Sequence, residues 1–85
     1  MPLSTVSITD QVRARIEQAM PGSDVQVTGS GGHFHIRVVS EQFAGLNTLK
    51  KQRLVYSAFK DLMAGDSAPV HAVDSMITLT PDQAG

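Results

Sequence analysis

The segment His33–Val39, His-Phe-His-Ile-Arg-Val-Val, alternates between polar and apolar side chains. A period of two is typical of a β-strand with one buried and one solvated face. The apolar side chains are predicted to enter the core, namely Phe34, Ile36 and Val38. The polar side chains are predicted to face solvent, namely His33, His35 and Arg37. The strand therefore places two of the chain's three histidines on one exposed face, about 7 Å apart at a rise of ~3.4 Å per residue.

Upstream of this strand, the sequence predicts a helix and a first strand. Apolar residues recur at every fourth position from Ile8, Ser7 is placed to cap this helix, and Pro21-Gly22 ends it. Residues 25–28 alternate as a short strand, and the glycine-rich residues 29–32 predict a loose hairpin loop. The loop is literally G-x-x-G, an element that clamps nucleic acid in KH domains, but there it joins two helices and here two strands.

Downstream, residues 40–47 are predicted to form a loop that is held down by Phe43. A second helix follows, capped by Asn47 or Thr48 and ending at Ala64-Gly65. Its broad apolar face consists of Leu54, Val55, Ala58, Phe59, Leu62 and Met63. We expect Val55, Phe59 and Leu62 of this face to share one core with Phe34 and Ile36.

Residues 70–80 are predicted to form the third strand. Its apolar residues fall on two faces, with Val73, Ile77 and Leu79 on one and Val70, Ala72 and Met76 on the other. A strand, a helix and a strand within one small domain imply a parallel crossover. The predicted fold is therefore α+β, in the order α-β-β-α-β, with a three-stranded mixed sheet and both helices packed on one face.

Composition limits the functions that are open to the chain. The 85 residues suit a single domain, residues 1–85, with a small core. The net charge of -1 argues against nonspecific polyanion binding as the main role, and the lack of cysteine excludes disulfides and thiolate chemistry. The N-terminus lacks a signal-peptide pattern and no apolar run reaches membrane-spanning length, so we expect a cytoplasmic protein with no membrane partner.

The histidines are the residues with an unusual arrangement. His33 and His35, two positions apart on a strand, can both bind one metal ion, and His71 could join them if the strands are neighbours. This pattern suggests a small histidine-based zinc protein, although Arg37 would repel a cation. Asp74 is three residues from His71, so on a regular strand the two side chains point to opposite faces. The sequence has no nucleophile elbow, zinc-protease helix or paired carboxylates, so we do not expect an enzyme.

A second candidate site lies at the start of the second helix, where Lys50, Lys51 and Arg53 are crowded together. The helix dipole favours anions at this end. A bound phosphate is one explanation, which would suit a DNA-binding transcriptional regulator, and a solvated basic surface is the other.

Several separated motifs, taken together and in order, resemble the BolA family. They are His33-Phe34, Val38-Val39-Ser40, Phe43-Ala44-Gly45, Gln52-Arg53-Leu54-Val55-Tyr56, Val70-His71-Ala72-Val73 and Thr80-Pro81. Lys50-Lys51-Gln52 replaces an Arg-His pair of the founding member and resembles the bacterial subgroup that is associated with acid stress. The tryptophan that usually follows the Thr-Pro tail is missing, since the chain ends Asp82-Gln83-Ala84-Gly85.

The resemblance implies a class II KH-like fold, partnership with a monothiol glutaredoxin and glutathione, a shared [2Fe-2S] cluster and, in some members, DNA binding. The family's cluster ligand in the His-Ala motif falls on His71. A second ligand usually lies in the hairpin loop, but residues 29–32 contain neither cysteine nor histidine, and His33 is the nearest substitute. A chain without cysteine cannot hold such a cluster alone. The expectation is an adaptor in iron–sulfur trafficking, iron homeostasis or stress response, with the DNA regulator and the zinc protein as alternatives.

Overall fold

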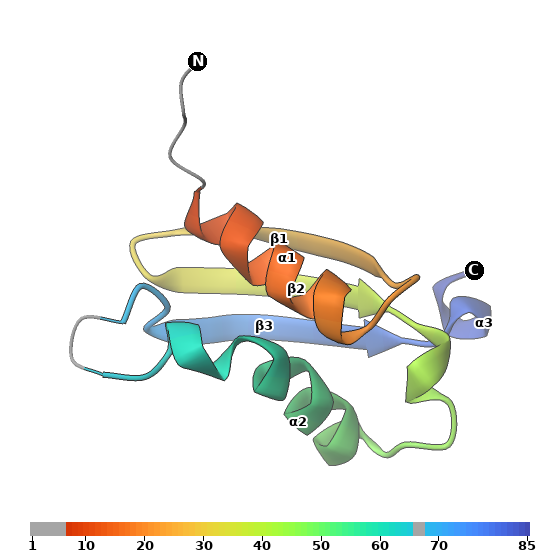
Figure 1. The fold of residues 1–85 in the computed structure, drawn as a ribbon. Helices are drawn as coiled ribbons and strands as arrows, with labels where there is room; N and C mark the ends of the chain where they lie inside the picture. The colour runs from red at the N-terminus through yellow and green to blue at the C-terminus, as the bar shows by residue number, and fades with distance from the viewer. Residues whose placement is uncertain (1–6, 66–67) are drawn as a thin grey trace.

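The computed structural model describes residues 7–65 and 68–85 (Figure 1). The prediction that the N-terminus lacks a signal-peptide pattern concerns residues 1–6, which lie outside this range. The main elements are α1 (Ile8–Ala19), β1 (Asp24–Ser30), β2 (His33–Val39), α2 (Thr48–Phe59) and β3 (Ala72–Leu79). Two 3-10 turns, η1 (Glu41–Phe43) and η2 (Lys60–Leu62), and a short terminal helix, α3 (Pro81–Ala84), complete the chain. The predicted α-β-β-α-β order is confirmed, whereas α3 had not been predicted.

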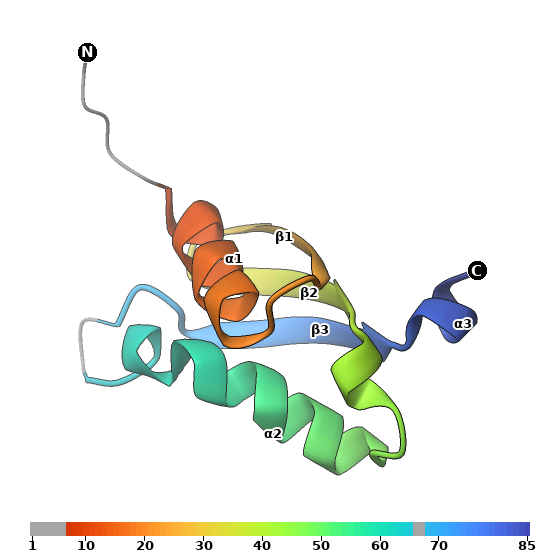
Figure 2. The same cartoon turned by 45° about the vertical axis from the view of Figure 1, so that its right-hand side comes forward.

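The sheet has the strand order β1-β2-β3, with β1 antiparallel and β3 parallel to β2. Helices α1 and α2 cover one face of this sheet, and the opposite face carries no helix of comparable length within the described residues (Figures 1 and 2). Phe34, Ile36, Val55, Phe59 and Leu62 belong to one buried cluster, as predicted. None of the helices in the described part of the chain is long and apolar enough to span a bilayer.

Both long helices begin at the predicted caps. The Ser7 hydroxyl accepts a hydrogen bond from the Asp10 backbone N–H at 3.2 Å. At the start of α2, the Asn47 side chain accepts one from the Lys50 backbone N–H at 2.9 Å, so Asn47 is the cap of the two candidates. Each bond satisfies a backbone donor that the helix itself leaves unpaired.

The hairpin between β1 and β2 is tighter than the loose loop that its glycines suggested. The strand pairing continues to Ser30 opposite His33, which leaves Gly31-Gly32 as a two-residue turn. Both glycines have positive φ, +63° and +83°, as a type I′ turn requires. The prediction of a four-residue loop was wrong, because Gly31 and Gly32 alone reverse the chain.

The second helix also ends earlier than predicted. Its α-helical part stops at Phe59 and the next three residues form the 3-10 turn η2, rather than one helix running to Ala64-Gly65. The Leu62 carbonyl accepts a hydrogen bond from the Val70 backbone N–H at 3.1 Å. Tightening of the last turn is common at helix ends and here brings the chain back toward β3.

The predicted facial pattern of β3 was wrong because the strand contains a β-bulge. Phe34 pairs with Val73, but the next residue of β2 pairs with Ser75, so Asp74 is an extra residue. Beyond the bulge, the alternation of the strand is inverted. Val73 and Met76 therefore both pack against the core, three positions apart, while Ile77 is 48% exposed.

Candidate functional site

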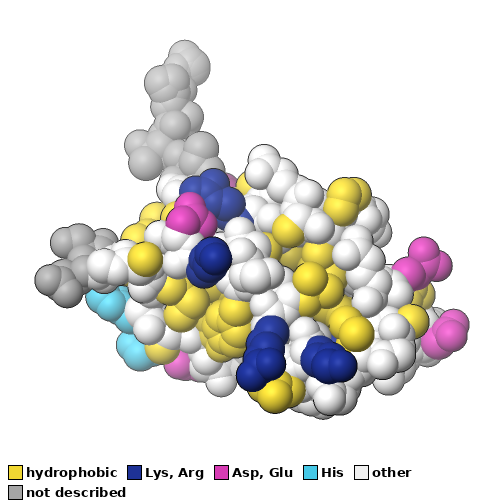
Figure 3. Space-filling model, turned by 60° about the horizontal axis from the view of Figure 1, so that its bottom comes forward, with side chains coloured by type: hydrophobic (Ala, Val, Ile, Leu, Met, Phe, Trp, Pro, Cys, Tyr) yellow, Lys and Arg dark blue, Asp and Glu magenta, His cyan; other side chains and the backbone are white. Residues whose placement is uncertain are grey.

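The three histidines lie on β2 and immediately before β3, and all three are exposed. The structure ties His71 to the hairpin turn, because its backbone N–H donates to the Gly32 carbonyl at 2.8 Å. The Ala72 N–H donates to the same carbonyl at 2.9 Å. His71 is therefore fixed next to the residue that precedes His33. In the space-filling view, histidine side chains lie at one edge of the molecule (Figure 3).

Gly32 supports His71 in a second way. The ring of His71 packs over the Gly32 Cα so closely that a Cβ on residue 32 would overlap the ring atom Cδ2. At the neighbouring Gly31 a Cβ would meet nothing within 4 Å. Gly32 is thus needed both for the turn and for the position of the His71 ring.

The two histidines of β2 each contact a polar residue of β3 across the open face. His33 Nδ1 lies 3.3 Å from Asp74 Oδ1, and His35 Nδ1 lies 2.9 Å from Ser75 Oγ. The bulge brings Asp74 to His33; on a regular strand Asp74 would stand opposite His35. Periodicity could not reveal this contact, because the inserted residue changes the register of the strand.

The arrangement does not support a self-contained zinc site. Among the described residues, no group of three or more His, Cys, Asp or Glu side chains could hold a metal ion. A structural zinc site usually has four protein ligands. The zinc protein that was suggested by His33, His35 and His71 is therefore not favoured, whereas one or two exposed imidazoles can complete a metal site whose other ligands come from another molecule.

The basic residues at the start of α2 are solvent-accessible. Lys50 and Arg53 are exposed and Lys51 is half-buried. Within the described part of the chain, the ion pairs involve other residues: Asp10 with Arg13, Arg15 with Asp61, and His33 with Asp74. Figure 3 shows the basic side chains on this side of the molecule in separate groups, with apolar and uncharged surface between them. The predicted basic helix start exists, but it is not part of a broad positive surface.

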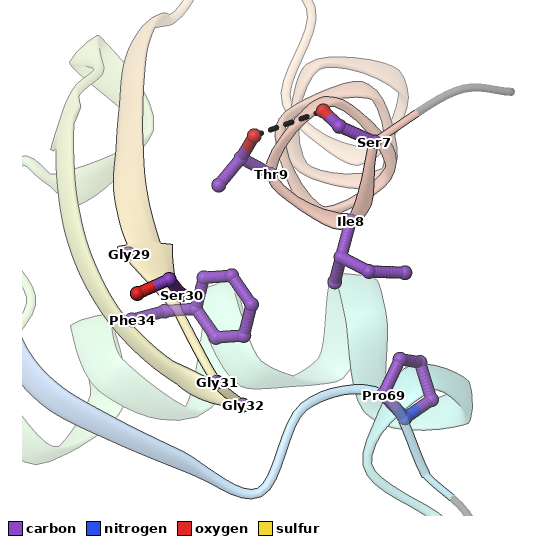
Figure 4. Close-up of a pocket in the computed structure, with 9 residues that line it drawn as sticks. All are labelled: Ser7, Ile8, Thr9, Gly29, Ser30, Gly31, Gly32, Phe34 and Pro69. Carbon is purple, nitrogen blue, oxygen red and sulfur yellow. Dashed lines mark hydrogen bonds between the residues drawn. The ribbon is translucent and has the colours of Figure 1, made fainter.

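A shallow pocket of about 170 Å³ adjoins the hairpin turn, between it and the start of α1 (Figure 4). Its lining side chains are uncharged: Ser7, Ile8, Thr9, Gly29, Ser30, Gly31, Gly32, Phe34 and Pro69. The Ser7 hydroxyl is already used in the α1 cap and in a 3.0 Å contact with Thr9. The polar side chains that line the pocket are therefore hydroxyl groups, those of Ser7, Thr9 and Ser30, and no histidine lines it.

Comparison with known proteins agrees with the motif order and the fold. Residues 3–83 match the protein family described as BolA-like protein. This chain belongs to the BolA family. Among solved structures, a BolA homologue from Coxiella burnetii superposes with a TM-score of 0.75 at 34% identity, covering 94% of this chain and 97% of that one. BolA1 from Arabidopsis thaliana has a TM-score of 0.79 at 22% identity, covering 95% and 100%, and shows the shared fold.

Curated BolA relatives differ in length. BolA-like protein 1 of Mus musculus is 36% identical over 72 residues, which cover 73% of this chain and 50% of the mouse protein. The chain thus spans about half the length of that relative. The acid stress protein IbaG of Escherichia coli strain K12 is 32% identical over 72 residues, covering 85% of this chain and 82% of that protein.

Proposed function

We propose that this BolA-family chain is an adaptor that binds a monothiol glutaredoxin and contributes histidine ligation to a [2Fe-2S] cluster shared by the two proteins. The observation that carries the proposal is His71, an exposed residue whose backbone N–H donates to the Gly32 carbonyl and whose ring lies directly against Gly32. A ligand offered to a partner's cluster must be accessible, and it binds best when its position is set in advance.

The donor set fits a shared cluster. Iron–sulfur clusters are held mainly by thiolates, and histidine replaces cysteine on one iron in some of them. The chain has three histidines and no cysteine, so the thiolates would come from glutaredoxin and glutathione. His71 would be the first imidazole, and His33, one residue after Gly32, the second. When bound, the cluster would supply redox and iron–sulfur transfer chemistry, while this chain would bind and orient it.

The test is to mix the purified chain with a cluster-loaded monothiol glutaredoxin and record complex size and visible absorption. The chain alone should be colourless. The mixture should form a one-to-one complex with an altered spectrum, because an imidazole replaces a thiolate on one iron. His71→Ala should abolish this spectral change, and His33→Ala should weaken it if His33 stands in for the loop ligand.

His35→Ala is the matched control, since it removes another exposed imidazole from the same chain. It should leave the spectrum of the complex unchanged. A His71→Ala complex with the wild-type spectrum would contradict the ligand assignment. Failure of the wild-type chain to form any complex would contradict the adaptor role itself.

DNA binding is a second candidate, favoured by the accessible cations at the start of α2. If they neutralise phosphates, replacing Lys50, Lys51 and Arg53 with alanine should lower the log–log salt slope by roughly 0.9 for each phosphate that the variant no longer neutralises. Lys60→Ala is the control, because Lys60 is an exposed cation at the other end of the same helical segment. Unchanged DNA affinity in the triple variant would exclude this surface.

A further inference from the structure

The bulge in β3 gives Asp74 a contact that a regular strand would not allow. Ala72 pairs with His33 and Val73 with Phe34, but Ser75 takes the next position, opposite His35. Asp74 is left without a partner position on β2. Its carboxylate Oδ1 lies 3.3 Å from His33 Nδ1. The extra residue therefore directs a carboxylate onto one nitrogen of one histidine.

The chemistry of this contact selects a tautomer. An ionised carboxylate only accepts hydrogen bonds, so the His33 nitrogen that faces it must carry the proton. In a neutral ring, a proton on Nδ1 leaves Nε2 with a free lone pair. The neighbouring contact has no such effect, because the Ser75 hydroxyl can donate to His35 Nδ1 or accept from it.

The hydrogen bond to Asp74, rather than packing by neighbouring side chains, orients the His33 ring. The His33 side chain is 60% exposed and that of Asp74 46% exposed, so core packing does not lock the imidazole. Histidines that bind metals commonly donate their second ring N–H to a carboxylate, which sets both tautomer and orientation. His33 and Asp74 have this arrangement in the protein alone, without a bound metal.

We propose that Asp74 is a positioning residue that holds the proton of His33 on Nδ1 and leaves Nε2 as the coordinating atom of a second imidazole ligand. The ligand role rests on the proposed function, whereas the tautomer belongs to the free protein. The two imidazoles would act from one place in the fold, because the Gly32 carbonyl binds the backbone of His71 and residue 32 directly precedes His33.

The first measurement uses the ¹⁵N-labelled chain alone, at a pH where its histidines are neutral, and reads each tautomer from long-range ¹H–¹⁵N spectra. His33 should be predominantly the Nδ1–H form, and Asp74→Ala should lower that fraction. Ser75→Ala is the matched control, since it removes the polar partner of the next histidine and should leave His33 unchanged. A wild-type His33 that is mainly Nε2–H, or one unaffected by Asp74→Ala, would overturn the proposal.

The second measurement titrates the same variants with the cluster-loaded glutaredoxin. Loss of a carboxylate behind a ligating histidine typically lowers metal affinity by about 10–100-fold. Asp74→Ala should weaken the cluster interaction within that range, and adding it to His33→Ala should have no further effect. Wild-type affinity in both single variants would overturn the ligand role of His33 and Asp74. Failure of the proposed function is distinct, since the wild-type chain would then form no complex with the glutaredoxin.

Discussion

The two faces of the sheet take alternate residues of the same strand, β2, yet different forces shape them. On the helix-covered face, Phe34, Ile36 and Val38 are at most 3% exposed and belong to one core. On the open face, the side chains of His33 and His35 make polar contacts with β3 while remaining exposed. Burial determines which side chains occupy the covered face. On the open face, the backbone of the turn and of the bulge determines which side chains meet.

This difference explains where function can reside in so small a domain. A residue on the covered face is constrained by its volume, because a close-packed core tolerates little change in side-chain size. A residue on the open face can be exchanged for its chemistry, provided that the backbone beneath it is kept. The candidate ligands, and the residues that hold them, lie on or beside the open face.

The largest expected effect is on the covered face. Phe59 is completely buried between α2 and the sheet, and Phe59→Ala should cost about 3–5 kcal/mol, because it leaves a cavity where an aromatic ring was. A domain of this size has little more stability than that to lose. Urea or thermal unfolding provides the measurement.

Leu49→Ala is the control for Phe59→Ala. Leu49 lies on the same helix but is 54% exposed, so its loss should change stability by no more than about 0.5 kcal/mol. A melting temperature that is nearly unchanged in Phe59→Ala would show that the covered face does not hold the fold together.

The covered face could be predicted from the sequence because buried residues recur at the period of the strand or helix that carries them. Alternation in residues 33–39 and spacings of three and four in α2 identified Phe34, Ile36, Val55 and Phe59 as core residues. The caps were also predictable, since Ser7 and Asn47 act on backbone donors a few residues away.

The open face was predicted only in part. His33 and His35 were correctly placed in solvent, and the motif pattern singled out His71. The contact between His33 and Asp74 was missed because a bulge inserts one residue without leaving a mark in composition or period. The role of Gly32 was missed for a related reason. Residue 32 must be small because the ring of His71, from another segment of the chain, lies against it, and the local sequence shows only the requirement of the turn.

The next effect in size compares two adjacent glycines of the turn. Gly31→Ala should cost about 1–2 kcal/mol, because its φ of +63° is strained for a residue with a Cβ. Gly32→Ala has the same kind of strain and also places a Cβ against the His71 ring, so it should cost more. Denaturant unfolding measures the difference in stability.

The His71 ring resonances give an independent readout of the glycine pair. They should shift strongly in Gly32→Ala and little in Gly31→Ala, because only residue 32 lies under the ring. Equal stabilities and equal His71 shifts in the two variants would show that Gly32 serves the turn alone.

A smaller effect tests the bulge. Met76 is half-buried against the core, so Met76→Ala should destabilise the fold by about 1–2 kcal/mol, less than a fully buried methionine would. Ile77 is 48% exposed on the open face, and Ile77→Ala should change stability by no more than about 0.5 kcal/mol. Chemical unfolding provides the measurement. A larger loss of stability in Ile77→Ala than in Met76→Ala would contradict the bulge and support a regular strand, in which Ile77 shares a face with Val73.

The smallest effect concerns a polar contact on the helical side. Arg15 Nη2 lies 2.7 Å from Asp61 Oδ2, joining α1 to η2. The hydrogen bond from Arg15 lowers the pKa of Asp61, and the positive charge of Arg15 adds to the effect. Exposed ion pairs contribute little and are screened by salt. Asp61→Asn should therefore lower the melting temperature at neutral pH by less than Phe59→Ala or Met76→Ala does.

The pH dependence of Asp61→Asn gives the sign of this contribution. Because the folded-state pKa of Asp61 is lowered, its stabilising effect is present above the unfolded-state pKa, near the ordinary aspartate value of 3.8, and is lost as the pH falls through the folded-state pKa. The difference in melting temperature between the wild type and Asp61→Asn should accordingly shrink on acidification, and shrink at neutral pH when salt is added. A difference that grows as the pH falls would show that Asp61 stabilises the fold in its protonated form, and that the ion pair with Arg15 is not the cause.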